Sequence, residues 1–404
     1  MIDAEMQWIE SAIEKVAETG KKEDGTYWRA TYTDEDKKGV ELLKRWMKDA
    51  GFYTYFDTVG NLYGRIEGRT KDVILAGSHR DTVKNGGKYD GVLGIITAIS
   101  ACASLYREYG IPKKTVEVVA LCEEEASRFL AGYVGSRAIT GTLRNENLQE
   151  LDENGVSLEE AMRCAGYYEG VLPKERGNVK QFLELHIEQG GFLESAGKQV
   201  GIVTAIVGIF AGDIYFYGEQ NHAGTTPMSM RKDPVPVAAS FVTALNKWAM
   251  TKGDKLVCTI GNVVIEPGKS NVIANKVKIT FDIRSESQEL LTEAKNKIES
   301  LLKEFPEYMP ETDFACQDSP VAMDAGGIER LKQLAEKENQ KVALMPSGAG
   351  HDSQIIAQKI KTNMIFVPSE RGISHSPLEY TDIMDIRPGY TLMKSYLKEK
   401  GWGK

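Results

Sequence analysis

The chain has 404 residues, of which 42% are hydrophobic and 27% charged, and its formal net charge at pH 7 is -8. This length predicts two domains, or one domain with a large insertion, and the apolar fraction is ample for a packed core. The acidic balance argues against a nucleic-acid partner, and neither a membrane-spanning run nor a secretory signal is found, so we expect a cytoplasmic protein without a membrane partner.

The first part of the chain alternates between helices and short apolar strands. Predicted helices cover residues 4–18, 34–50 and 92–108, and predicted strands cover 52–56, 62–66, 73–75 and 115–121. This alternation is typical of an α/β sheet with helices on both faces. In such a sheet, functional residues gather where strands end and loops begin.

Between about residues 207 and 320 the same alternation repeats on a smaller scale. The predicted order is a strand at 213–220, a helix at 234–250, strands at 256–266 and 276–284, and a helix at 286–304. A helix at 326–338, a strand at 364–367 and a helix at 385–399 then follow. We therefore predict a two-domain fold: a mixed-sheet α/β domain, residues 1–206 and 321–404, with an inserted α+β domain at 207–320.

The five histidines are the most informative residues for function. Each lies in a segment rich in glycine, small residues or carboxylates, and none lies on the apolar face of a clear helix: His79, His186, His222, His351 and His375. A single histidine is more often a structural residue than a ligand. Five in such settings indicate a polar site.

His79 follows the strand-like run VILAG, so it stands at the carboxyl end of a strand. Asp81 lies two residues on and can face the same way. A metal-bound imidazole needs a carboxylate or carbonyl on its other nitrogen, which Asp81 is placed to supply. Asp90 lies in the glycine-rich loop NGGKYDGVLG just before a helix, where it can serve the site, cap the helix, or do both.

Glu123, Glu124 and Glu125 follow directly on the strand TVEVVAL. Three consecutive glutamates usually form a solvated loop, but here they emerge where a buried strand ends. One can then bind metal while its neighbour moves a proton. His186 ends another alternating run, and two histidines with several carboxylates suit Zn, Mn or Co better than Mg or Ca.

Six segments occur in a fixed order: GSHRDTVKNGGKYDGVLG, EEEASRF, LHIEQG, NHAGTTPM, SGAGHDSQ and GISHSP. From about residue 34 to the C-terminus the chain resembles the M20 metallopeptidase-related amidohydrolases. More narrowly, it is similar to the branch of allantoate amidohydrolases, N-carbamoyl-L-amino acid hydrolases and β-ureidopropionases. Six ordered motifs are a far more specific signal than one short pattern.

The resemblance implies two divalent metal ions per subunit, Zn, Mn or Co. It assigns His79 and His186 to one metal, Glu125 and His375 to the other, and Asp90 as the bridge between them. It also implies that Glu124 is the general base and that Asp81 orients His79. Two cations about 4 Å apart lower the pKa of a shared water and polarise the carbonyl under attack.

The resemblance further implies that the inserted domain is a lid and the interface of a homodimer. His222 would reach the active site of the partner subunit and help to stabilise the oxyanion. Asn271 and Arg284 would hold the carboxylate of the substrate, and Gln189 and Gly350 would line a ureido pocket.

The expected reaction is hydrolysis of a carbamoyl C–N bond in a small ureido acid, foremost an N-carbamoyl-L-amino acid, with release of ammonia and carbon dioxide. Allantoate is the nearest alternative substrate. A dipeptidase or aminoacylase of the wider family is a third possibility. A catalytically inactive binding protein is a fourth, and the intact set of ligands with Glu124 argues against it.

Three departures from the family pattern stand out. Ala126 replaces a glycine, and the methyl group should be tolerated. Arg80, inside the HxD motif, should point away from the metals and have a structural role. The apolar run 209–211, Ile-Phe-Ala, replaces polar residues that suit a second ureido group, so it favours a substrate with one ureido group over allantoate.

Overall fold

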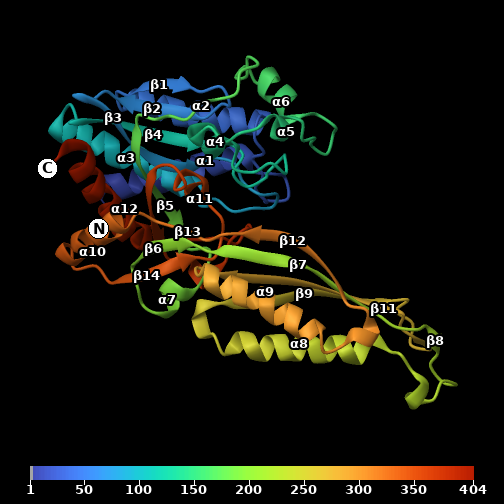
Figure 1. The fold of residues 1–404 in the computed structure, drawn as a ribbon. Coiled ribbons are helices and arrows are strands. Elements are labelled where there is room, and N and C mark those ends of the chain that lie inside the picture. The colour runs from blue at the N-terminus through green and yellow to red at the C-terminus, as the bar shows by residue number, and fades with distance from the viewer. Residues whose placement is uncertain (1–2) are drawn as a thin grey trace. The chain divides into compact units, whose positions relative to one another are not determined.

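The computed structural model describes residues 3–404. Contacts divide the chain into two compact units, the first running up to Thr204 and resuming at Met323, and the second spanning Ala205–Ala322 (Figure 1). The structure confirms the α/β class with a mixed sheet. Within residues 3–404, no helix combines the length and apolar character needed to cross a membrane.

The larger sheet has nine strands in the order β1-β2-β4-β3-β5-β15-β6-β13, with β14 paired to β6. Their bounds are β1 Tyr53–Phe56, β2 Leu62–Ile66, β3 Thr70–His79, β4 Lys114–Leu121, β5 Val179–Ile187, β6 Val200–Ile206, β13 Val321–Ala322, β14 Val342–Ser347 and β15 Lys361–Val367. Neighbours β4, β3, β5 and β15 run parallel, whereas β1, β2, β6 and β13 pair antiparallel. The four parallel strands therefore end at one edge of the sheet.

Helices pack on this sheet, and α3 is the most deeply buried of them. The helices of the first unit are α1 Ala4–Gly20, α2 Asp34–Asp49, α3 Val92–Tyr109, α4 Val134–Thr140, α5 Asn145–Leu148, α6 Leu158–Cys164, α7 Phe192–Ser195, α10 Ala325–Lys337, α11 Asp352–Ile356 and α12 Ile383–Leu397. Apolar residues of α3 are buried on nearly all sides, as expected for a helix without a polar face. It packs against β3, α1 and α12, so the start of α3 is held rigidly at the sheet edge.

The second unit has a four-stranded antiparallel sheet in the order β12-β7-β11-β9 and two helices, α8 and α9, packed against it (Figure 1). Its elements are β7 Gly208–Tyr217, β8 Asn221–His222, α8 Pro234–Met250, β9 Val257–Glu266, β10 Val272–Ile273, β11 Lys276–Ser285, α9 Gln288–Leu302 and β12 Glu311–Asp318. Short 3-10 turns lie at Met228–Met230, Gly253–Lys255, Pro306–Tyr308 and, in the first unit, Glu370–Gly372, and a π-helical turn at Lys398–Trp402 follows α12. Residues of β7 and β11 alternate between buried and half-buried, which builds a separate apolar core against α8 and α9.

Candidate active site

The carboxyl ends of the parallel strands bring together side chains that are far apart in sequence. His79 is the last residue of β3, residues 123–125 follow β4, and His186 precedes the last residue of β5. Asp90 joins them from the loop before α3. This is the edge at which open α/β sheets bind ligands.

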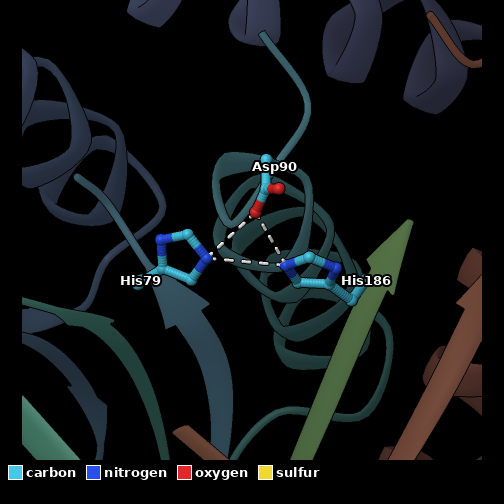
Figure 2. A group of neighbouring side chains, drawn as sticks. All are labelled: His79, Asp90 and His186. Carbon is cyan, nitrogen blue, oxygen red and sulfur yellow. Dashed lines mark hydrogen bonds and ion pairs between the residues drawn. The ribbon is translucent and has the colours of Figure 1, made fainter. Parts of the chain in front are cut away.

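Asp90 lies between two imidazoles, as Figure 2 shows. Its Oδ1 atom is 3.1 Å from Nε2 of His79 and 3.1 Å from Nε2 of His186, and the two Nε2 atoms are 3.5 Å apart. Only glycine fits at Gly91, because its φ is +68° and a Cβ there would lie 2.4 Å from the His79 ring. The cap of α3 is Gly91, with no side-chain hydrogen bond, so of the roles left open for Asp90 the structure does not support the helix cap.

The far nitrogens of both imidazoles face backbone carbonyls. Nδ1 of His79 is 3.1 Å from the carbonyl oxygen of Asp81, and Nδ1 of His186 is 2.9 Å from that of Ile187. Each contact requires a proton on Nδ1, which in the neutral ring leaves a lone pair on Nε2. The amide of Gly91 donates to Nε2 of His186 at 3.2 Å, in keeping with this tautomer.

Several buried acceptors of this cluster lack a donor. Within residues 3–404, Oδ1 of Asp90, Oε1 of Glu125 and Oε1 of Gln189 are buried and receive no hydrogen bond. A buried acceptor without a partner costs about 1–3 kcal/mol, more when it is charged. Lone pairs that converge in this way suit a cation, and the group His79–Asp90–His186 has the donor types that Zn, Mn or Co accept.

His375 and Glu125 form a second group on the other oxygen of Asp90. Nε2 of His375 is 3.4 Å from Oδ2 of Asp90 and 3.5 Å from Oε2 of Glu125. Gln189 donates from its side-chain amide to the same Oδ2 at 2.7 Å, and that nitrogen lies 3.3 Å from Nε2 of His375. The two oxygens of Asp90 thus face two separate sets of candidate ligands.

Glu124 lies beside this cluster, and its Oε2 is 3.9 Å from Nε2 of His79. Asp81 holds the loop that carries Glu124, since its two carboxylate oxygens accept the amides of Glu124 at 3.1 Å and Glu125 at 3.2 Å. The Asp81 carboxylate is 3.9 Å from Nδ1 of His79, so the backbone carbonyl of Asp81, and not its carboxylate, is the group that meets this imidazole.

Burial and crowded charges shift the titration of these groups. Burial raises the pKa of Glu124 well above its usual value. Burial lowers the pKa of His79, but the carboxylates of Glu124, Asp90 and Glu125 outweigh it and hold that pKa well above its usual value. Hydrogen bonds to Asp90 and Glu125 raise the pKa of His375 to about 10. A site so rich in carboxylates attracts protons or metal cations.

Three residues support the site, of which Glu379 and Ser374 were not singled out from the sequence. Oε1 of Glu379 accepts the amides of Tyr89 at 2.9 Å and Asp90 at 3.1 Å, and the Ser374 hydroxyl can donate to either Glu379 or Asp90. Both lie within four residues of His375, and this proximity is the signal that could have found them. Glu123 accepts the amides of residues 128 and 129 and so closes the loop after β4.

Gly350 lies in the first unit, before α11. A Cβ on it would lie 2.1 Å from the hydroxyl of Tyr133, so a larger residue there would have to displace this hydroxyl. His351, the fifth histidine, is buried and packs edge-on against His186, with ring centroids 4.5 Å apart.

The remaining predicted residues lie in the second unit. His222 and Asn271 are neighbours at one end of its sheet, where β8 pairs with β10 and the amide of Ala223 donates to the carbonyl of Asn271 at 3.0 Å. Arg284 lies near the other end of β11, eight residues beyond Lys276, about 26 Å along an extended strand. Its guanidinium is bonded to both carboxylate oxygens of Asp282, at 2.9 and 3.1 Å.

The apolar run at the start of β7 does not act as one surface. Phe210 is buried in the core of the second unit, in edge-on contact with Phe281 and Phe314. Ile209 and Ala211 lie on the opposite face, and Ile209 pairs directly with Arg284. Of the run 209–211, Phe210 therefore cannot share a face with Arg284, because strand alternation turns it inward.

Comparison with known proteins extends these observations. Residues 74–399 match the model of peptidase family M20/M25/M40. The allantoate amidohydrolase of Escherichia coli (strain K12) is 38% identical over 414 residues, covering 100% of both chains. The N-carbamoyl-L-amino-acid amidohydrolase of Pseudomonas sp. (strain NS671) is 37% identical over 392 residues, 93% of this chain and 94% of that protein. A crystal structure of a hydantoinase/carbamoylase family amidase from Burkholderia multivorans superposes with a TM-score of 0.92 at 30% identity, over 98% of this chain and 97% of that one.

Fold, ligand cluster and relatives together define a hydrolase that acts on carbon–nitrogen bonds. The chain belongs to the peptidase family M20/M25/M40, and its similarity to the amidohydrolase branch of that family is confirmed. The relatives carry two different substrate names, allantoate and N-carbamoyl-L-amino acids, at nearly equal identity.

Proposed function

We propose that the chain hydrolyses the carbamoyl C–N bond of a small ureido acid at a centre of two divalent cations. The observation that carries this proposal is the convergence of Nε2 of His79, Nε2 of His186 and the unbonded Oδ1 of Asp90 within 3.5 Å of one another. Both imidazoles keep the proton on Nδ1 for a backbone carbonyl, so their other lone pairs are available to a cation.

The two proposed ligand sets lie on the two carboxylate oxygens of Asp90. His79 and His186 would hold one cation, Glu125 and His375 would hold the other, and Asp90 would bind both. Zn, Mn and Co all accept these donors. Bound there, the cations would supply an activated water and polarise the scissile carbonyl.

Glu124 is the proposed proton carrier. Its carboxylate is buried beside the ligand His79 and is not itself needed as a ligand in either set. It would take a proton from the attacking water and deliver it to the departing nitrogen. Asp81 fixes the position of Glu124 through its amide, so the base and the ligand Glu125 are held by one carboxylate.

Arg284 is the proposed anchor for the carboxylate of the substrate, because its guanidinium can bind a carboxylate through two bonds. Asp282 already occupies that fork, so a substrate must share or displace this contact. Ile209 lies directly opposite Arg284 and offers no polar group for a second ureido moiety. This favours an N-carbamoyl-L-amino acid, with allantoate as the second candidate on the strength of its named relatives.

We also propose a homodimer through the second unit. Strand β9 is the edge of its sheet and exposes apolar side chains: Val257, Val263, Val264 and Ile265. An apolar edge strand with free backbone groups favours pairing with another chain. His222 and Asn271 lie toward the opposite end of β11 from Arg284, which supports the proposal that a second copy supplies the first two.

Ammonia release from ureido acids, and amino-acid release from dipeptides, test the reaction over a substrate panel. Purified protein loaded with Zn, Mn or Co would be given allantoate, N-carbamoyl-β-alanine, several N-carbamoyl-L-amino acids and a set of dipeptides. We expect activity on N-carbamoyl-L-amino acids and its loss on chelation. Activity on dipeptides alone would contradict the ureido assignment, and preference for allantoate would replace the leading substrate by the second. Sedimentation of the full chain tests the dimer.

A further inference from the structure

The side chains of Tyr133 and Gln354 have no role in the mechanism above. Tyr133 directly precedes α4 and has a left-handed backbone with φ 54°. The amide of Tyr133 donates to the carbonyl of Glu124 at 3.3 Å, and the next amide, of Val134, donates to the carbonyl of Glu123 at 3.0 Å. The backbone of Tyr133 is therefore held by the same loop that carries the proposed base.

The hydroxyl of Tyr133 lies close to Gly350, in the segment before α11. It lies 2.1 Å from the position that a Cβ on Gly350 would take, and Oε1 of Gln354 lies 3.2 Å from that same position. Gln354 is held in the first turn of α11, where its amide donates to the carbonyl of His351 at 2.8 Å. Helices α4 and α11 pack against each other, so both side chains stand on a rigid support.

Both polar atoms are uncommitted. Among residues 3–404, neither the Tyr133 hydroxyl nor Oε1 of Gln354 makes a hydrogen bond, and both side chains are only half-buried. Polar groups that are fixed in place and still unpaired are suited to bind a ligand. The absence of a side chain at Gly350 allows the Tyr133 hydroxyl to approach the backbone of this segment closely.

The chemistry of the pair matches the end of a ureido group. An amide Oε1 accepts a hydrogen bond, whereas a phenolic hydroxyl both donates and accepts. A terminal carbamoyl group presents N–H donors and a carbonyl acceptor on one planar unit, whereas a formyl group lacks the N–H donors. We propose, on the basis of the ureido hydrolysis proposed above, that Tyr133 and Gln354 bind the terminal –NH2 of the substrate and select carbamoyl over formyl or acyl groups.

Paired substrates test this selection. We would measure kcat/KM for N-carbamoyl-L-methionine and N-formyl-L-methionine, which differ only in the –NH2 group, with the metal-loaded full chain. Loss of one hydrogen bond to the substrate should lower kcat/KM by about ten-fold. Tyr133→Phe and Gln354→Leu should each lower kcat/KM for the carbamoyl substrate by that factor. Each should change kcat/KM for the formyl substrate by less than about two-fold.

Two further variants sharpen the result. Gly350→Ala places a methyl group against the Tyr133 hydroxyl and should also lower the carbamoyl-to-formyl ratio, but with a smaller effect in the Tyr133→Phe background. Tyr55→Phe is the matched control, because it removes a hydroxyl that bonds to Glu117 instead, and its ratio should equal that of the wild type.

Each outcome bears on one proposal or the other. If the wild type hydrolyses ureido acids but Tyr133→Phe and Gln354→Leu leave the ratio unchanged, or reduce both substrates equally, the selection is refuted and the ureido function stands. If the wild type hydrolyses no ureido acid, the ureido function is refuted and the selection is refuted with it.

Discussion

Arg80→Met is expected to destabilise the first unit strongly. Nε and Nη2 of Arg80 donate to the two carboxylate oxygens of Asp36 at 2.7 and 3.1 Å, and Nη1 donates to the carbonyls of Gly60 at 2.9 Å and Ala120 at 3.3 Å. Arg80 is 1% exposed and Asp36 is 2% exposed. The structural role expected for Arg80 therefore takes the form of a buried ion pair between β3 and α2.

The magnitude follows from what the substitution leaves behind. Removing one partner of a buried ion pair costs about 3–5 kcal/mol, because the remaining charge is buried and unpaired. Asp36 would keep one donor, the amide of Tyr32 at 2.9 Å, and the two carbonyls would lose theirs. We therefore expect a loss of about 4 kcal/mol in the free energy of unfolding.

Urea unfolding followed by tryptophan fluorescence measures this loss. Arg163→Met is the control, since Arg163 pairs with Glu159 on the surface and such a pair contributes only about 0.3–0.5 kcal/mol. In Arg80→Met with Asp36→Leu neither charge of this pair remains, so the double variant should regain part of the lost stability, although buried Arg29 also loses Asp36 as a neighbouring carboxylate. A loss below about 1 kcal/mol in the single variant, or no recovery in the double one, would refute the reasoning.

Three other predictions concern titratable groups. Glu124→Gln should retain bound cations but lose turnover by about 100- to 10,000-fold, as metal analysis and kcat would report; full activity would rule out Glu124 as the base. Because carboxylates hold the pKa of His79 above its usual value, protons compete with the cation, so the measured metal affinity should rise from pH 6 to 8, and a flat profile would contradict this. Burial raises the pKa of Asp352 to about 8, so between about pH 4 and 8 the folded state keeps a proton that the unfolded state has lost, and stability falls as pH rises. Asp352→Asn should flatten that slope in urea unfolding from pH 5 to 8, and an unchanged slope would show that another group causes it.

The sequence predicts the site better than it predicts the orientation of individual groups. Apolar runs that end at His79, Glu123 and His186 are visible in the sequence, and parallel strands must end at one edge, so their meeting follows from general rules. The contacts of Asp81 do not follow from them. Spacing by two residues turns its side chain toward the site, but only the tertiary packing of the loop after β4 decides that its carboxylate binds two amides while its carbonyl meets His79.

The second unit illustrates two different errors. Strand β12 was missed because Glu311–Asp318 is polar, mostly exposed and without clear alternation. The inward position of Phe210 was not predicted, because the strand was predicted from Asp213, whereas β7 begins at Gly208. With the full length of the strand, a period of two places Phe210 on the same face as Ile214 and Phe216, both buried. The information was present in the sequence, but it depended on the first residue of the strand.

Asp81 connects the proposed metal ligands to the proposed base. Its carbonyl meets the imidazole of His79, a proposed ligand of one cation, and its carboxylate holds the amides of Glu125, a proposed ligand of the other, and of Glu124, the proposed base. Any shift of Asp81 therefore moves all three groups together. Arg80, the preceding residue, anchors this backbone on the opposite side through its buried pair with Asp36. The arginine in the HxD motif thus supports the backbone next to Asp81, and its hydrogen bonds to Asp36, Gly60 and Ala120 involve none of the proposed ligands.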